Sequence, residues 1–132
     1  MATTKSYTDV AQSKKLAEIL PFESADMEYI LEQWETGYHK EYCEIPVVKV
    51  NDDCPLHPIT LHCWSLTALL DVIPKCIGDY NIFRMDINDK DFSIWYDEIG
   101  YGVNNKLPDI TMKEPIDACY EMILKLKELN LL

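Results

Sequence analysis

The sequence predicts an α+β fold, in which an antiparallel sheet of two hairpins is covered by two or three helices. Two stretches alternate apolar and polar residues on both sides of a turn signal, which is typical of hairpins. Three other stretches repeat apolar residues at helical spacing next to capping or terminating residues. Because hairpins this short are not stable alone, we expect both to join one sheet, with the polar alternate residues facing solvent.

The first helix is predicted over residues 9–20. Thr8 is a suitable N-cap and Pro21 ends the helix. Ser24 and Asp26 follow, and because their side chains compete for backbone hydrogen bonds, we expect the chain to reverse there.

The first hairpin is predicted over residues 27–50. Met27, Tyr29 and Leu31 alternate as in a strand. Tyr29, Ile30 and Trp34 could instead share one face of a helix. We prefer the strand. Residues 36–37 are then the turn, and 38–50 form the partner strand.

A loop is expected over residues 51–58, which contain two prolines, and a buried helix follows. Ser65 is its predicted N-cap and Pro74 its stop. The second hairpin comprises residues 83–87 and 92–96, with a turn between them.

The end of the chain predicts a last helix. The glycines of residues 100–105 add turn signals and favour a short edge strand. Pro115 then opens the helix as its first residue, with an apolar face that runs from Ile116 to Leu129.

Length and composition predict one domain, residues 1–132. Hydrophobic residues make up 48% of the chain and charged residues 27%, as in globular proteins. The 12 Lys and Arg against 23 Asp and Glu give a net charge of −11, which argues against direct nucleic-acid binding because the surface repels phosphates. With only four glycines and no glycine-rich loop, nucleotide hydrolysis by a P-loop is excluded.

The expected compartment is the cytoplasm. The first twenty residues lack the apolar stretch of a secretory signal, and no apolar run is long enough to span a membrane. Five cysteines form an odd set without a compact framework, which suits reduced thiols.

Four segments carry a resemblance to a known family: Gln12–Leu16, Ser24–Met27, Trp64–Leu70 with Pro74, and Asp117–Met122. Together they sample most of the chain, and it resembles a family of small uncharacterised proteins of gut Bacteroidales and their prophages. Since that family has no assigned activity, the resemblance implies a cytosolic bacterial or phage setting and supplies no catalytic or binding residue.

A candidate metal site comprises Cys54, His57, His62 and Cys63. Thiolates and imidazoles are the ligands that zinc prefers, but structural zinc sites pair ligands two to four residues apart on two knuckles. The alternative is a proline-rich loop with a surface histidine and a buried cysteine. We prefer this alternative and predict no cofactor.

Two cysteines could be imagined as nucleophiles, Cys63 beside His62 and Cys43 near His39. A nucleophilic thiol needs a lowered pKa and a neighbouring base. Nothing distinguishes these cysteines from buried structural ones, which we prefer.

Carboxylates gather around the second hairpin and could do acid–base work or hold Mg²⁺. Most such clusters are solvated faces, and the turn at residues 88–91 lacks the ligand order of a calcium loop. The residues concerned are Asp86, Asp89, Asp91, Asp97 and Glu98.

Aromatic residues suggest an interaction surface, because eight Tyr and three Trp exceed what a small core needs. Amphipathic aromatics on a sheet are typical of protein interfaces. The alternative interpretation is that they cap the open side of the sheet and have no binding role. The aromatic residues that fall on the predicted strands or turns are Tyr29, Trp34, Tyr38, Tyr42, Trp95, Tyr96 and Tyr101, of which Trp34, Tyr38, Trp95 and Tyr101 are the candidate binding residues.

Our functional hypothesis is a non-catalytic protein-binding or regulatory module of mobile-element or phage type, with a protein partner or a second copy of itself. One variant uses the acidic surface to mimic nucleic acid. The alternative is a small hydrolase or metal-dependent enzyme.

Overall fold

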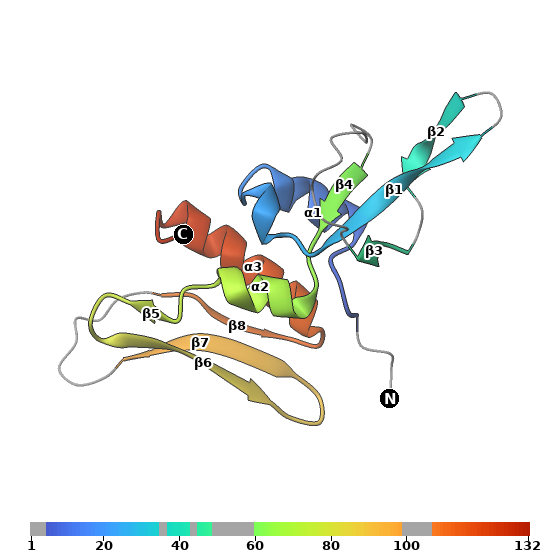
Figure 1. Cartoon of the computed structure of the whole chain (residues 1–132). Coiled ribbons are helices and arrows are strands. Elements are labelled where there is room, and N and C mark those ends of the chain that lie inside the picture. Colours follow the sequence, from blue (N-terminus) through green and yellow to red (C-terminus); the bar gives the residue numbers. More distant parts are fainter. Residues whose placement is uncertain (1–4, 35–36, 43–44, 49–59, 99–106) are drawn as a thin grey trace. The chain divides into compact units, whose positions relative to one another are not determined.

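The computed structural model describes residues 5–34, 37–42, 45–48, 60–98 and 107–132, with the backbone alone for 31–34, 37–42 and 60. The helices in this part of the chain are α1 (Val10–Ala17), the short 3-10 helix η1 (Phe22–Ser24), α2 (Leu66–Val72) and α3 (Pro115–Glu128). The strands are β1 (Met27–Trp34), β2 (Gly37–Tyr42), β3 (Val47–Val48), β4 (Thr60–Cys63), β5 (Cys76–Ile77), β6 (Asn81–Ile87), β7 (Phe92–Glu98) and β8 (Asp109–Met112) (Figure 1). The predicted α+β class is confirmed.

The described chain forms two compact units, Tyr7–Ala68 and Leu69–Leu132 with Lys5 and Ser6. Each unit has its own antiparallel sheet. The two hairpins therefore belong to different sheets, and the expectation that they join one sheet is wrong. The sequence pattern predicts that each hairpin pairs with further strands, but it does not predict which strands these are. None of the helices in the described residues is long and apolar enough to cross a membrane.

In the unit Tyr7–Ala68 the sheet is built around β1. Its second half pairs with β2, in a register from Leu31↔Tyr42 to Trp34↔Gly37, and its first half pairs with β3 and β4. The preferred strand interpretation is thus confirmed. The predicted partner strand at 38–50 is two separate strands instead of one, and Pro46 before β3 has no N–H for a continuous ladder.

The first helix is shorter than predicted and has a different cap. Asp9, not Thr8, is the N-cap, since its Oδ1 accepts the N–H of Gln12 at 2.7 Å and its own N–H donates to Oε1 of Gln12 at 3.1 Å. This reciprocal pair is a capping box. Thr8 is fully buried and accepts the N–H of Trp64 on Oγ1 instead.

The second unit contains the sheet β5-β6-β7-β8. The predicted second hairpin is confirmed, with a register from Asn81↔Glu98 to Ile87↔Phe92. Strands β5 and β8 were not predicted because they are only two and four residues long. The edge strand expected within residues 100–105 and the loop expected at 51–58 lie outside the described residues.

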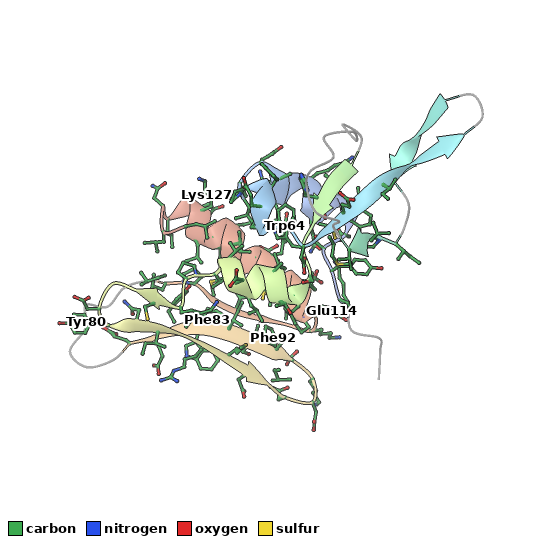
Figure 2. The ribbon with its side chains drawn as sticks, viewed as in Figure 1. Trp64, Tyr80, Phe83, Phe92, Glu114 and Lys127 are labelled. Carbon is green, nitrogen blue, oxygen red and sulfur yellow. The ribbon has the colours of Figure 1, made fainter. Side chains whose placement is uncertain are left out.

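One face of this second sheet packs against α3, which contacts β7 and β8. Figure 2 shows Phe83 and Phe92 on the side of the sheet that bears the helix. We call this side the apolar face; beyond the polar pair Asn81 and Glu98 at one end, its residues on β6, β7 and β8 are Phe83, Met85, Ile87, Phe92, Ile94, Tyr96, Ile110 and Met112. Helix α3 begins at Pro115 as predicted and buries Ile116, Ala118, Cys119, Met122, Ile123 and Leu126.

The β6 end of the apolar face departs from the prediction. Its apolar residues Met85 and Ile87 are 51% and 74% exposed, whereas their neighbours on β7, Ile94 and Phe92, are buried. Helix α3 covers β7 and β8. The alternating pattern of β6 therefore predicts the correct face of the strand, but it does not predict whether the helix reaches that part of the sheet.

Candidate functional site

The predicted metal ligands are not brought together where the structure describes them. Cys54 and His57 lie outside the described residues. Adjacent residues His62 and Cys63 on β4 point to opposite faces: Cys63 is fully buried, and His62 stacks on Phe22 with ring centroids 5.7 Å apart. Among the described residues no group of three or more metal-binding side chains could hold an ion.

Cys63 belongs to a buried hydrogen-bonded cluster around Thr8. Its thiol donates to the carbonyl of Thr8 at 3.3 Å, and the hydroxyl of Tyr29 donates to the same oxygen at 2.7 Å. The Thr8 and Ser13 hydroxyls pair at 2.8 Å. Backbone bonds between Thr8 and Trp64 tie the cluster to the end of β4.

This environment keeps the Cys63 thiol neutral. Burial raises its pKa above the ordinary value and outweighs the hydrogen bonds from Thr8, Ser13 and Tyr29, which lower it. A reactive cysteine needs the opposite shift and access to a substrate. Cys63 is therefore a structural residue. The side chains of Cys43 and His39 lie outside the described part of the chain.

The hairpin carboxylates are spread over three locations. Asp86 and Asp97 lie on one face of the sheet, and Glu98 lies on the other, opposite Asn81. Asp89 and Asp91 lie in the turn, where the Asn88 side-chain carbonyl accepts the N–H groups of Lys90 and Asp91 at 2.9 and 2.8 Å. That geometry is an Asx turn, as the sequence suggested.

Two of the aromatic strand residues are core residues. Tyr29 is 2% exposed, and Tyr96 is buried, with its hydroxyl donating to the carbonyl of Pro74 at 2.7 Å. Burial raises the pKa of both phenols. Neither is available to a partner. The side chains of Trp34, Tyr38, Tyr42 and Tyr101 lie outside the described residues.

Trp95 lies on the face of the second sheet opposite α3. We call this side the open face; its residues are Cys76, Ile82, Arg84, Asp86, Ser93, Trp95, Asp97, Asp109 and Thr111. None of these residues is buried, and Trp95 and Ser93 are half-buried. The open face is thus a described surface that carries one of the predicted binding residues.

The register places Trp95 at the centre of the open face. Arg84 on β6 and Asp109 on β8 are its direct neighbours across the sheet. Arg84 forms an ion pair with Asp97, with Nε and Oδ2 3.6 Å apart. The hydroxyls of Ser93 and Thr111 share a hydrogen bond of 2.9 Å. Because β7 is paired on both sides, the tryptophan is presented by a rigid strand.

Some surface residues were missed from the sequence. Tyr80 is 54% exposed in the turn before β6, and Arg84 is the cationic neighbour of Trp95. The predicted turn at residues 88–91 places residue 87 opposite residue 92, so the pairing of Arg84 with Trp95 could be predicted from the sequence. The exposure of Tyr80 has no sequence signal.

Comparison of the chain with family models, with curated proteins and with solved structures finds no match.

Proposed function

We propose that this chain is a non-catalytic protein-binding module of mobile-element or phage type that contacts its partner through the open face around Trp95. The observation that carries this proposal is the half-buried tryptophan at the centre of a sheet face on which no described residue is buried. The module needs no cofactor. It acts in the cytoplasm, which keeps its free thiols Cys63, Cys76 and Cys119 reduced.

The composition of the open face supports protein recognition. Trp and Arg, with Tyr, are the residue types enriched among those that dominate binding energy at protein interfaces. Trp95 supplies apolar area with few rotatable bonds, and Arg84 beside it supplies directed N–H donors.

The charge of the open face favours a basic partner. It carries three carboxylates, Asp86, Asp97 and Asp109, against the single cation Arg84, on a chain whose net charge is −11. Complementary fields speed the association of such a pair. The carboxylates alternate with Arg84 and Trp95, which favours an aromatic contact surface over a mimic of a phosphate backbone.

The test compares two aromatic substitutions. The Trp95→Thr variant keeps a residue suited to strands but removes the indole, and Tyr80→Thr removes an exposed aromatic from the turn before β6, outside the strands of the sheet. Tagged wild-type and variant proteins are used to capture partners from an extract of the native cells, with circular dichroism to confirm folding. We expect Trp95→Thr to weaken binding of a captured partner by about thirtyfold, as for a central interface residue, and Tyr80→Thr to leave it unchanged. Equal capture by both variants would exclude the open face as the binding surface.

A further inference from the structure

Among the described residues, the outer side of strand β6 is largely unpaired. The two residues of β5 pair only with Asn81 and Ile82, and the carbonyl of Lys75 then accepts the N–H of Phe83 at 2.9 Å. Beyond Phe83, no strand among the described residues pairs with β6 on this side, and Figure 1 shows β6 continuing well past β5.

Two hydrogen bonds show which backbone groups point outward. Asn88 donates its N–H to the carbonyl of Asp91 at 3.1 Å, so Asn88 is turned toward the β7 side. The N–H of Phe83 points to the β5 side. The side to which the backbone N–H and C=O groups point alternates from one residue of a strand to the next. The groups of Arg84 and Asp86 therefore point to β7, and those of Met85 and Ile87 point outward. We call these four groups the free edge.

The side chains at the free edge differ between its two faces. Met85 and Ile87 are 51% and 74% exposed on the apolar face. Asp86, between them, is exposed on the open face. An added strand would meet apolar side chains on one side of the sheet and a carboxylate on the other.

We infer that the free edge binds an extended segment of a partner protein as a further antiparallel strand, with a Lys or Arg opposite Asp86 and apolar side chains opposite Met85 and Ile87. The inference rests on the proposed function and names its binding mode and the chemistry of the partner segment. Main-chain bonds supply affinity in this kind of recognition, and alternate side chains supply specificity.

The register argues against a second copy as the occupant. Two β6 strands that pair through Met85 and Ile87 place Asp86 opposite Asp86 of the other copy, which is repulsive. Shifting the pairing so that Arg84 lies opposite Asp86 brings Ile87 of the other copy against Phe83, where Lys75 already lies. A strand with a basic residue meets neither obstacle.

The probe is a blocked synthetic peptide, Thr-Val-Lys-Ile-Thr, added to the isotope-labelled full chain. We expect amide chemical-shift changes and slowed hydrogen exchange centred on Met85 and Ile87, and about tenfold weaker binding when the peptide lysine is replaced by glutamate or when its backbone is N-methylated. If millimolar probe leaves these two amides unchanged, or if the glutamate peptide binds equally well, the inference is wrong.

A pair of variants isolates the backbone contribution. Met85→Pro removes an outward N–H without removing a β6–β7 hydrogen bond, and proline is tolerated at sheet edges. Met85→Ala also loses the side chain but keeps the N–H. We expect about tenfold weaker probe binding for Met85→Pro than for Met85→Ala. Equal binding by the two variants would overturn the inference.

Partner capture separates this inference from the proposed function. If Trp95→Thr loses the captured partner and Met85→Pro retains it as well as Met85→Ala does, the protein-binding function stands and strand addition is wrong. If Met85→Pro binds the probe weakly but Trp95→Thr captures normally, the free edge is a binding site and the open face is not.

Discussion

At the scale of single residues, the Thr8 carbonyl joins distant parts of the chain. It accepts from the Tyr29 hydroxyl and the Cys63 thiol, which come from positions 21 and 55 residues further along the chain. Thr8 resembled a helix cap in the sequence because capping depends on local neighbours, whereas this cluster depends on distant ones. No spacing rule links residues so far apart, so sequence alone predicted a buried cysteine but not its partners.

The second buried thiol predicts a pH dependence of stability. Cys119 is fully buried on α3, and burial raises its pKa to about 12. In the unfolded chain a cysteine ionises near its ordinary pKa of about 8.5. The unfolded state therefore loses this proton first as the pH rises, and the stability held below that pH is lost progressively.

We expect this thiol to cost about 2 kcal/mol of unfolding free energy between pH 7 and pH 10. Urea unfolding of the wild type and of Cys119→Ala measures it, because the variant lacks the titrating group. The wild type should lose more stability than the variant over this range. Parallel pH profiles would show that the thiol ionises equally in both states.

At the scale of elements, the start of α2 shows what local sequence can specify. Ser65 was predicted as its N-cap, and its Oγ accepts the N–H of Ala68 at 3.2 Å. The same hydroxyl donates to Asp26, whose other oxygen accepts the Ser65 N–H at 2.9 Å. The cap was readable from the sequence, but the link to a residue 39 positions earlier was not.

The double role of Ser65 predicts a measurable loss on substitution. We expect Ser65→Ala to lower the free energy of unfolding by about 1–2 kcal/mol, since it removes the cap and one partner of Asp26. Ser65→Thr keeps the hydroxyl and should lose much less. Denaturant unfolding of both variants checks this, and equal losses would show that the hydroxyl bonds contribute nothing net.

The strands show where pattern reasoning stops. Alternation predicted both strands of the second hairpin and the correct face of each, because period two determines the face. It did not predict that α3 would leave Met85 and Ile87 exposed, since that depends on where a helix from another part of the chain lies. Nor did it predict β8, where four residues are too few to show a period.

Asp86 at the free edge predicts a change of oligomeric state. Charged residues on edge strands prevent the edges of two molecules from pairing. When two β6 strands pair through Met85 and Ile87, Asp86 of one copy faces Asp86 of the other. Asp86→Thr removes this repulsion and adds a β-branched residue, so we expect concentration-dependent dimerisation in analytical ultracentrifugation. Asp71→Thr removes another exposed carboxylate, from α2, and should leave the sedimentation unchanged. An Asp86→Thr protein that sediments like the wild type would show that this carboxylate does not protect the edge.

At the scale of the whole molecule, the excess of acidic over basic residues influences how the protein associates with any charged partner. The charge of −11 produces a field that extends beyond any single contact and attracts cationic segments from solution. The attraction of an ion pair at Asp86 acts only at short range. The attraction of the summed charges acts at long range, and added salt weakens it because the Debye length becomes shorter. Salt dependence therefore distinguishes a molecular field from one local pair.

We expect the lysine probe to bind the wild type several-fold more weakly when ionic strength rises from about 0.01 M to about 0.1 M, because the Debye length falls from about 30 Å to about 10 Å. A probe with threonine in place of lysine carries no net charge and should bind with little salt dependence, since only backbone and apolar contacts remain. Asp86→Asn removes the local partner but leaves a net charge of about −10, so the lysine probe should bind it more weakly yet keep most of its salt dependence. If Asp86→Asn abolishes the salt dependence altogether, the attraction is confined to that one carboxylate and the net charge contributes nothing to partner choice.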